Sequence, residues 1–354
     1  MSERSFSERL LAWYRVSGRH DLPWQQDKTP YRVWVSEIML QQTQVATVIP
    51  YYQRFMASFP TLEDLASATQ DQVLQHWSGL GYYARGRNLH KAARQAHEAW
   101  GDLPDDVEAL EALPGIGHST AGAISSIAFG RRALILDGNV KRVLARHRAV
   151  SGWPGRTAVS RELWQWADLY TPSAVQAGEY AQAIMDLGAT LCTRTQPRCG
   201  ECPVAEDCLG RGSGEPTAFP GKKPKKDKPV KSVRMWLVTN KKGEVLLQQR
   251  PAQGLWGGLW VLPEQRVDEP LDAWLSRRGW LGAEAVPLPK FRHSFSHFHL
   301  DVEPLLVQDI DSARVTECAD HSPEQWYNPR SPQGGIAAPV ARLLKSLPTD
   351  STGD

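Results

Sequence analysis

Apolar residues recur at three- and four-residue spacing through the first two thirds of the chain, a pattern typical of helices that bury one face. Stretches with the alternation of strands are scarce there. The helices expected from this spacing are 7–14, 31–49, 62–65, 69–77, 85–100, 105–113 and 119–129, and a further helical stretch follows Asp137 up to His147. The pattern therefore predicts an all-α first domain.

The pattern changes after residue 232. Short alternating or β-rich runs at 233–239, 245–249 and 299–307 are mixed with helix-like segments at 271–278 and 340–347. Between the two patterns, residues 216–232 read PTAFPGKKPKKDKPVKS, which has no hydrophobic period, is broken by prolines and is rich in lysine. We expect a multidomain chain, with a helical domain at 1–215, a linker at 216–232 and an α+β domain at 233–354.

Composition narrows the function classes only a little. The length of 354 residues is enough for two or three domains, and the content of 41% hydrophobic and 23% charged residues is typical of globular proteins. A net charge of +2 does not by itself indicate nucleic-acid binding, and the basic linker serves equally as a solvated tether or as a contact to phosphates. No apolar run approaches a membrane span, so no membrane partner is expected. The charged N-terminal residues contain no secretory apolar region, so we expect a cytoplasmic protein in a reducing compartment.

Four cysteines lie within residues 192–208, at Cys192, Cys199, Cys202 and Cys208, and the chain has one other, Cys318. Four thiolates can hold a tetrahedral zinc ion or a four-iron cluster. Structural zinc usually takes two Cys-x2-Cys pairs, and here only Cys199 and Cys202 form one. The spacing favours one [4Fe–4S] cluster, with zinc and disulfides as alternatives.

Leu113-Pro114-Gly115-Ile116-Gly117 joins two expected helices. Gly115 and Gly117 permit tight backbone geometry, so that amide groups at the start of the second helix can face an anion such as a DNA phosphate. An ordinary connection chosen for its turn chemistry explains the same residues.

Two carboxyl groups are candidates for the pair that cleavage of a glycosidic bond commonly needs. Asp137 follows an apolar segment and opens a helix, where amide hydrogen bonds would keep it ionised. Glu37 lies in a helix of apolar and uncharged residues, where desolvation would raise its pKa and let it donate a proton. Simple helix capping for Asp137 and a solvent-facing position for Glu37 remain alternatives.

The order of Glu37, the 113–117 hairpin, Asp137 and the cysteine array resembles the endonuclease III superfamily of helix-hairpin-helix DNA glycosylases over roughly the first 210 residues. Segments 22–24, 36–45 and 79–85 resemble its members that remove adenine mispaired with guanine or 8-oxoguanine. The resemblance implies base-excision repair on duplex DNA that carries such mispairs, by a monomer found with the chromosome.

Position 119 holds a lysine in the members that also cleave the strand, whereas this chain has Ser119. Serine cannot form the imine of the lyase reaction, so the resemblance implies a monofunctional glycosylase. Lys141 is an alternative lyase residue, and a bifunctional enzyme acting on oxidised pyrimidines is the rival reading.

The resemblance also implies roles for individual residues. Glu37 would protonate adenine N7, and Asp137 would stabilise the sugar cation with support from Asn139 and Ser119. The remaining implied contacts are to DNA by Gln41, Gln42, Tyr82, Gly115 and Gly117, and to the extruded adenine by Trp24, Leu40, Val45 and Gln182.

Residues 250–260 resemble the opening of the Nudix-like domain found at the C-terminus of these glycosylases. The glutamate-rich helix that holds magnesium in Nudix hydrolases is missing from 264–280, which disfavours a nucleotide hydrolase. By resemblance, Phe295, Ser296 and His297 would read 8-oxoguanine. An edge strand or a metal site are alternatives for this histidine-rich run, and a non-catalytic lesion-binding protein is the last rival.

Overall fold

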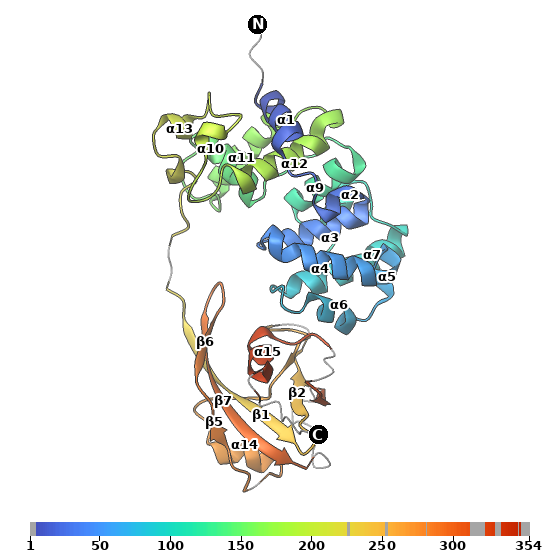
Figure 1. Cartoon of the computed structure of the whole chain (residues 1–354), viewed down its shortest axis with the longest axis vertical. Coiled ribbons are helices and arrows are strands. Elements are labelled where there is room, and N and C mark those ends of the chain that lie inside the picture. The colour runs from blue at the N-terminus through green and yellow to red at the C-terminus, as the bar shows by residue number, and fades with distance from the viewer. Residues whose placement is uncertain are drawn as a thin grey trace, which may run out of the picture. The chain divides into compact units, whose positions relative to one another are not determined.

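The computed structural model describes residues 5–224, 227–251, 254–280, 282–311, 323–329, 334–345 and 347. The chain divides into two compact units (Figure 1). Met1–Ser67 and Asn88–Lys225 form the helical unit, and Ala68–Arg87 and Lys226–Asp354 form the C-terminal unit. Cys318 and parts of two sequence predictions, 225–226 of the linker and 252–253 of the Nudix-like motif, lie outside the described residues.

The helical unit is built from α-helices, as the apolar spacing predicted. Its elements are α1 (Phe6–Ser17), α2 (Pro23–Gln26), α3 (Pro30–Leu40), α4 (Val45–Ser58), α5 (Leu62–Ser67), most of α7 (Ala84–Trp100), α8 (Val107–Ala112), α9 (His118–Phe129), α10 (Gly138–His147), α11 (Thr157–Tyr170), α12 (Ala174–Thr190), α13 (Leu209–Gly212) and the 3-10 helices Cys199–Glu201 and Pro216–Ala218. Helices far apart in the sequence share one core, in which Leu10, Leu144, Leu163, Ile184 and Leu187 are fully buried. Each such side chain contributes about 2 kcal/mol through burial.

The prediction of one continuous helix over 31–49 was wrong. Thr29 caps α3 by accepting a hydrogen bond from the Arg32 amide, and α3 ends at Leu40. Gln42 then takes a left-handed conformation with φ 57°, which interrupts the helix before α4 begins at Val45. Glutamine carries no sequence signal for this conformation, unlike glycine. The chain therefore turns sharply just after Glu37.

The C-terminal unit is α+β, as predicted. It contains α6 (Gln70–Trp77), β1 (Val230–Asn240), β2 (Val245–Gln249), β3 (Trp260–Val261), β4 (Glu264–Gln265), α14 (Leu271–Arg277), β5 (Val286–Pro287), β6 (Phe291–Ser294), β7 (His299–Ile310), β8 (Glu324–Tyr327) and α15 (Ala338–Lys345). The long strands β1 and β7 run parallel, with Val230 opposite His299 and Val238 opposite Val307. Strand β2 pairs antiparallel with β1 on its other side.

Helix α14 packs on one face of this sheet through tryptophans. The rings of Trp236 in β1 and Trp274 in α14 are stacked with centroids 4.2 Å apart, and Trp280 lies edge-on against Trp274. Alternate residues of β1 and β7, such as Val238 and Val307, complete this core. The period-two pattern of the strands thus places one apolar face under α14.

Helix α6 packs against the C-terminal part of the chain, although the sequence prediction placed it in the helical domain at 1–215. The Gln249 amide donates a hydrogen bond to Asp71 at 3.1 Å. Gly335 approaches α6 so closely that an added Cβ would lie 2.8 Å from the Cβ of Leu74, which is fully buried. The pairing of residues 68–87 with the C-terminal strands is a tertiary feature that periodicity does not report.

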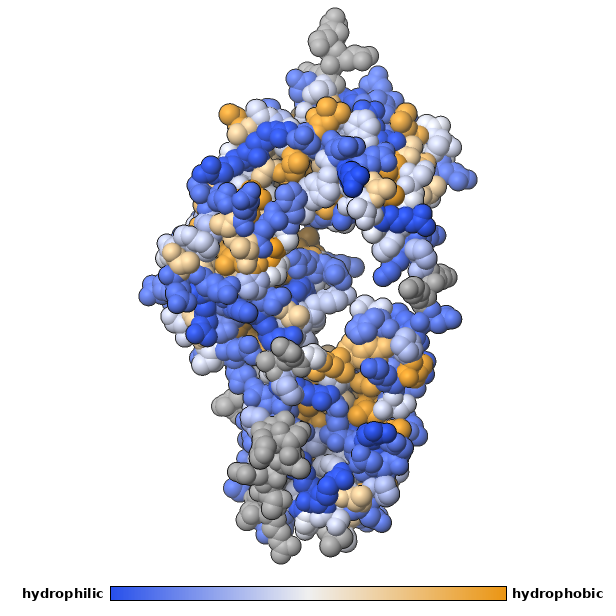
Figure 2. Space-filling view, turned by 180° about the vertical axis from the view of Figure 1, so that it is seen from behind, coloured by the Kyte–Doolittle hydropathy of each residue, from blue (hydrophilic) through white to orange (hydrophobic). Residues whose placement is uncertain are grey.

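Hydrophilic residues cover most of the face drawn in Figure 2. Within the part of the chain that the structure describes, no helix has the length and apolar character needed to cross a membrane.

Candidate active site

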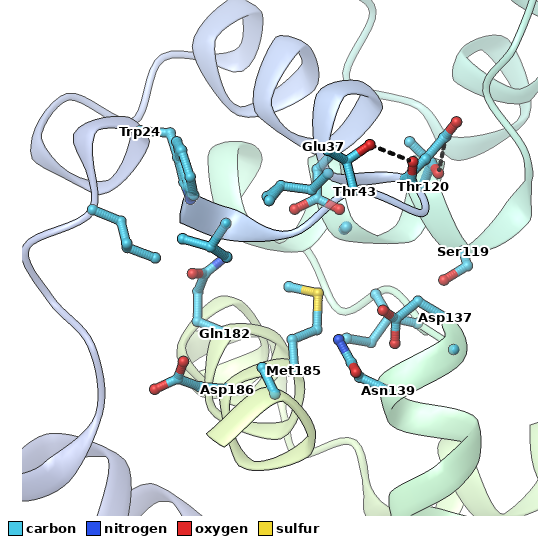
Figure 3. Close-up of a pocket in the computed structure, with 18 of the residues that line it drawn as sticks. Trp24, Glu37, Thr43, Ser119, Thr120, Asp137, Asn139, Gln182, Met185 and Asp186 are labelled. Atoms are coloured by element: carbon cyan, nitrogen blue, oxygen red, sulfur yellow. Dashed lines mark hydrogen bonds between the residues drawn. The ribbon is translucent and has the colours of Figure 1, made fainter. Parts of the chain in front are cut away.

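A cavity of about 730 Å³ opens in the helical unit. Helices α2, α3, α9, α10 and α12 and the turn after α3 supply its walls, and Figure 3 shows side chains from these segments pointing into one space. Of the residues predicted from the sequence, the cavity is lined by Trp24, Glu37, Leu40, Gln41, Gln42, Val45, Ser119, Asp137, Asn139 and Gln182. Residues that are remote in the sequence therefore converge here.

Glu37 enters the cavity from the last turns of α3, which buries its other faces through Trp34, Ile38 and Met39. Burial, and to a smaller extent the nearby charge of Asp137, raises the pKa of Glu37 to about 8. A carboxyl group with this pKa carries its proton at pH 7. It can act as a general acid, which an ordinary glutamate cannot do at that pH.

Asp137 caps α10 and accepts a hydrogen bond from the Val140 amide at 2.8 Å, as predicted. Burial nevertheless raises its pKa, while the Val140 hydrogen bond and the charge of Arg142 act in the opposite direction. The expectation that hydrogen bonding alone sets the charge state of Asp137 was incomplete, because sequence does not report how deeply the group is buried. Four groups on its own helix favour the carboxylate, namely the amides of Val140 and Asn139 and the charges of Arg142 and Lys141.

Ser119 and Asn139 stand beside this carboxyl group. The Leu136 amide donates a hydrogen bond to Ser119 Oγ at 2.9 Å, which ties the start of α9 to the segment before Asp137. Asn139 Oδ1 accepts a hydrogen bond from Arg142 Nη2 at 2.8 Å. Both side chains therefore hold the position of the helix start.

Arg142 extends this network to the cysteine array. Its Nε donates to the Cys192 carbonyl at 2.8 Å and its Nη2 donates to the Gly188 carbonyl at 2.6 Å. Gly188 lets α12 approach α10, since an added Cβ would lie 2.7 Å from the Cβ of Asn139. The role of Arg142 was not predictable from the sequence, because Gly188 and Cys192 are distant from it in the chain.

The opposite wall of the cavity is apolar and amide-lined. Trp24 is buried, with its ring edge-on to Tyr52 at 5.5 Å between centroids. Gln182 on α12 accepts a hydrogen bond from Gln25 at 2.7 Å. A flat, hydrogen-bonding heterocycle suits a wall of this composition. Further residues that line the cavity were not predicted as site residues, among them Arg19, Gln25, Thr43, Thr120, Met185 and Asp186.

The 113–117 segment forms the expected turn between α8 and α9. Gly115 has φ 83°, and an added Cβ there would lie 2.9 Å from the Cβ of Asn88. Gly117 is the N-cap residue of α9, is exposed, and has no side chain that could accept a capping hydrogen bond. Gln42, in the turn after α3, is also exposed. Backbone amides at a helix start can bind a phosphate, and that role for this turn stays a prediction.

Tyr82 and the segment 295–297 lie in the C-terminal unit. Phe295–Phe298 forms the tip of the β6–β7 hairpin, closed by a hydrogen bond from the Phe295 amide to the Phe298 carbonyl at 2.9 Å. Ser296 and His297 are exposed at this tip. Lys228, from the expected linker, donates to the Phe295 carbonyl at 2.8 Å. The alternative of one edge strand for the histidine-rich run 293–299 is wrong, because this run contains the end of β6, a turn and the start of β7.

The four cysteines surround one apolar cavity in the helical unit. They carry no disulfide. Arg146, which is buried, donates to Cys192 Sγ at 3.3 Å and to the Thr193 carbonyl at 2.7 Å. A buried guanidinium in this position would offset the negative charge of cysteine thiolates. Among the described residues, no group of three or more His, Cys, Asp or Glu side chains is arranged for a single metal ion.

Two known protein families match this chain, one in each of its two parts. Residues 35–168 match the family described as HhH-GPD superfamily base excision DNA repair protein, and residues 234–346 match the NUDIX domain. A thermostable thymine-DNA glycosylase of known structure shares the fold of the helical part, with a TM-score of 0.52, 24% identity, and coverage of 59% of this chain and 95% of that one.

Full-length relatives identify the branch of this superfamily. The chain is 36% identical to the adenine DNA glycosylase of Buchnera aphidicola subsp. Acyrthosiphon pisum over 98% of this chain and 99% of that protein. It is 39% identical to the human adenine DNA glycosylase over 84% of this chain and 65% of the human protein. The chain belongs to the adenine DNA glycosylases, the base-excision repair enzymes that cleave the N-glycosidic bond of adenine in DNA.

Proposed function

We propose that this enzyme removes adenine paired with 8-oxoguanine or guanine and leaves the DNA strand intact. The observation that supports the proposal is the single cavity that contains both Glu37, with a pKa raised to about 8, and the helix-capping Asp137. Glycosidic cleavage needs a proton donor and an anionic stabiliser of the sugar cation. The raised pKa of Glu37 favours the role of donor, whereas the hydrogen bonds and cations around Asp137 favour its anionic form.

The adenine must leave the base stack before it can reach Glu37, at a cost of a few kcal/mol that mispairing lowers. Gln41, Gln42 and Tyr82 would fill the vacated stack, and the amides of the 115–117 turn would bind the phosphate backbone. Trp24, Leu40, Val45 and Gln182 would hold the extruded base. Gln42 and Tyr82 are exposed and have positive φ angles of 57° and 50°, a conformation that in bulky residues is usually kept for function.

Glu37 would give its proton to adenine N7, which makes the base a neutral leaving group as the bond to the sugar breaks. The carboxylate of Asp137 would stabilise the positive charge that develops on the sugar, and water would complete hydrolysis. Ser119 supports a monofunctional reaction, because its hydroxyl already accepts the Leu136 amide and forms no imine. Lys141 is not one of the residues that line the cavity within the described chain.

The cysteines at 192, 199, 202 and 208 fit a [4Fe–4S] cluster, since they line one apolar cavity with a buried arginine directed at a sulfur atom. The cluster would hold the two ends of the 192–208 segment together, and Arg146 connects that segment to α10 through Cys192 and Thr193. Anaerobically purified protein is expected to contain about four iron atoms and four acid-labile sulfides per chain. Stoichiometric zinc without sulfide would contradict this assignment.

The proposed function is tested by single-turnover adenine release from an 8-oxoguanine·adenine duplex, with the labelled strand examined before and after alkali. Strand breaks are expected only after alkali, and an otherwise identical 8-oxoguanine·cytosine duplex should show none. Breaks before alkali would indicate lyase activity, to be checked with Lys141→Ala. A protein that binds the duplex but gives no breaks in either lane would be a lesion-binding protein instead.

A further inference from the structure

The turn that carries Tyr82 is built within the C-terminal unit. Gly79, Gly81 and Tyr82 all have positive φ angles, of 93°, 78° and 50°. Trp77 Nε1 donates to the Gly81 carbonyl at 3.1 Å, and the Arg85 guanidinium lies 5.2 Å from the centre of the Tyr82 ring. Tyr82 is 52% exposed, so the turn holds a large aromatic ring in a strained conformation and presents it to solvent.

Tyr83, the next residue, faces the interior and is buried. Its hydroxyl donates to the carbonyl of Ile336 at 3.1 Å and accepts the amide of Gly79 at 3.3 Å. Ile336 is itself fixed, because its neighbours exchange backbone hydrogen bonds with Trp260, at 2.8 Å from Gly335 and 3.2 Å from Ala337. One phenol therefore connects both ends of the Tyr82 turn to the segment that leads into α15.

A second contact joins the same turn region to the hairpin at 295–298. Arg87 Nη1 donates to the Gly257 carbonyl at 2.6 Å. Trp256, beside Gly257, also has a positive φ of 53°, and its ring centroid lies 5.6 Å from that of Phe295. The exposed Tyr82 and the exposed hairpin tip are thus supported by a continuous set of packed residues in one unit.

We propose that Tyr83 is a positioning residue, which uses its hydrogen bond to Ile336 to hold the Tyr82 ring where it meets the base opposite the adenine. This rests on the proposed function, in which Tyr82 enters the base stack. The C-terminal unit then acts on catalysis through Tyr82 as well as through the hairpin tip. Loss of the Tyr83 hydroxyl frees the strained turn to relax without removing any group that touches DNA.

The test is a double-mutant cycle of Tyr83→Phe and Tyr82→Leu, measured as single-turnover adenine release and duplex affinity on 8-oxoguanine·adenine DNA. When Tyr82 is present, Tyr83→Phe is expected to lower the product of the release rate constant and the duplex association constant roughly three- to tenfold. This is the factor that one buried hydrogen bond provides. In the Tyr82→Leu background, Tyr83→Phe should change them less than about twofold, because the two residues act as one unit.

Tyr31→Phe is the matched control. Tyr31 is buried in the helical unit, and its hydroxyl donates to the Phe59 carbonyl at 2.8 Å. This variant is expected to lose thermal stability comparably to Tyr83→Phe and to keep adenine release within about twofold of wild type. Equal losses from Tyr83→Phe in both Tyr82 backgrounds, or no loss in either, would overturn the positioning role alone. A wild-type enzyme that releases no adenine would overturn the proposed function, and the positioning role with it.

Discussion

Replacement of Glu37 by glutamine is expected to slow adenine release by about a hundred- to ten-thousand-fold, the range that a general acid contributes. Glutamine has nearly the same shape and keeps hydrogen-bonding capacity, but it has no proton that it can transfer to adenine N7. Binding of the mispaired duplex should persist. Glu98→Gln, which changes an exposed glutamate on α7, is the control and should release adenine at the wild-type rate. Wild-type turnover by the Glu37 variant would exclude Glu37 as the essential acid.

The pH dependence of the wild-type enzyme provides an independent check on the same residue. Since the pKa of Glu37 is raised to about 8, the rate constant for release should fall above that pH, where the acid has lost its proton. Stability should follow the same group. The unfolded chain releases this proton near pH 4.5 and the folded chain near pH 8, so the stabilisation is complete below pH 4.5 and is lost as pH rises toward 8. Glu37→Gln should remove this component of the pH dependence of unfolding.

Elements with a clear local period were predictable from sequence, and those that depend on distant partners were not. The helices at α6 and α7 and the strands β2 and β7 begin within a few residues of their expected positions. Helices α11 and α12 were not predicted. Helix α12 contains Gly188, which lowers helix propensity but permits the close contact with Asn139. The break at Gln42 was also missed, because its left-handed conformation comes from the surrounding structure.

The candidate site shows the same division. The cap that Asp137 makes to Val140 follows from local sequence and is present. The convergence of Glu37 with Asp137 was expected by resemblance alone, since one hundred residues separate them and no local pattern joins them. Arg142 connects Asn139 to the Cys192 carbonyl. This role could not be predicted from the sequence, because it depends on how α10 packs against α12.

Replacement of Asp137 by asparagine is expected to reduce adenine release by about a hundred- to a thousand-fold, as for the loss of one preorganised electrostatic group. Asparagine caps helices nearly as well as aspartate, so the hydrogen bond to the Val140 amide and the thermal stability should be largely kept. Asp106→Asn makes the same change at the cap of α8, where Asp106 accepts the Ala109 amide at 2.8 Å, and should leave release near wild type. A similar loss in both variants would point to capping rather than charge.

The Asp137→Asn variant should also report the electrostatic coupling between the two carboxyl groups of the wild-type enzyme. The charge of Asp137 contributes to the raised pKa of Glu37, so its removal should lower that pKa. The residual adenine release should then begin to fall at a lower pH than the value of about 8 expected for the wild-type acid. If the alkaline limb stays in place while the rate drops, Asp137 acts on the reaction without a charge that Glu37 experiences. A shift together with the drop is the outcome expected of two carboxyl groups that face one another across the cavity with opposite protonation states.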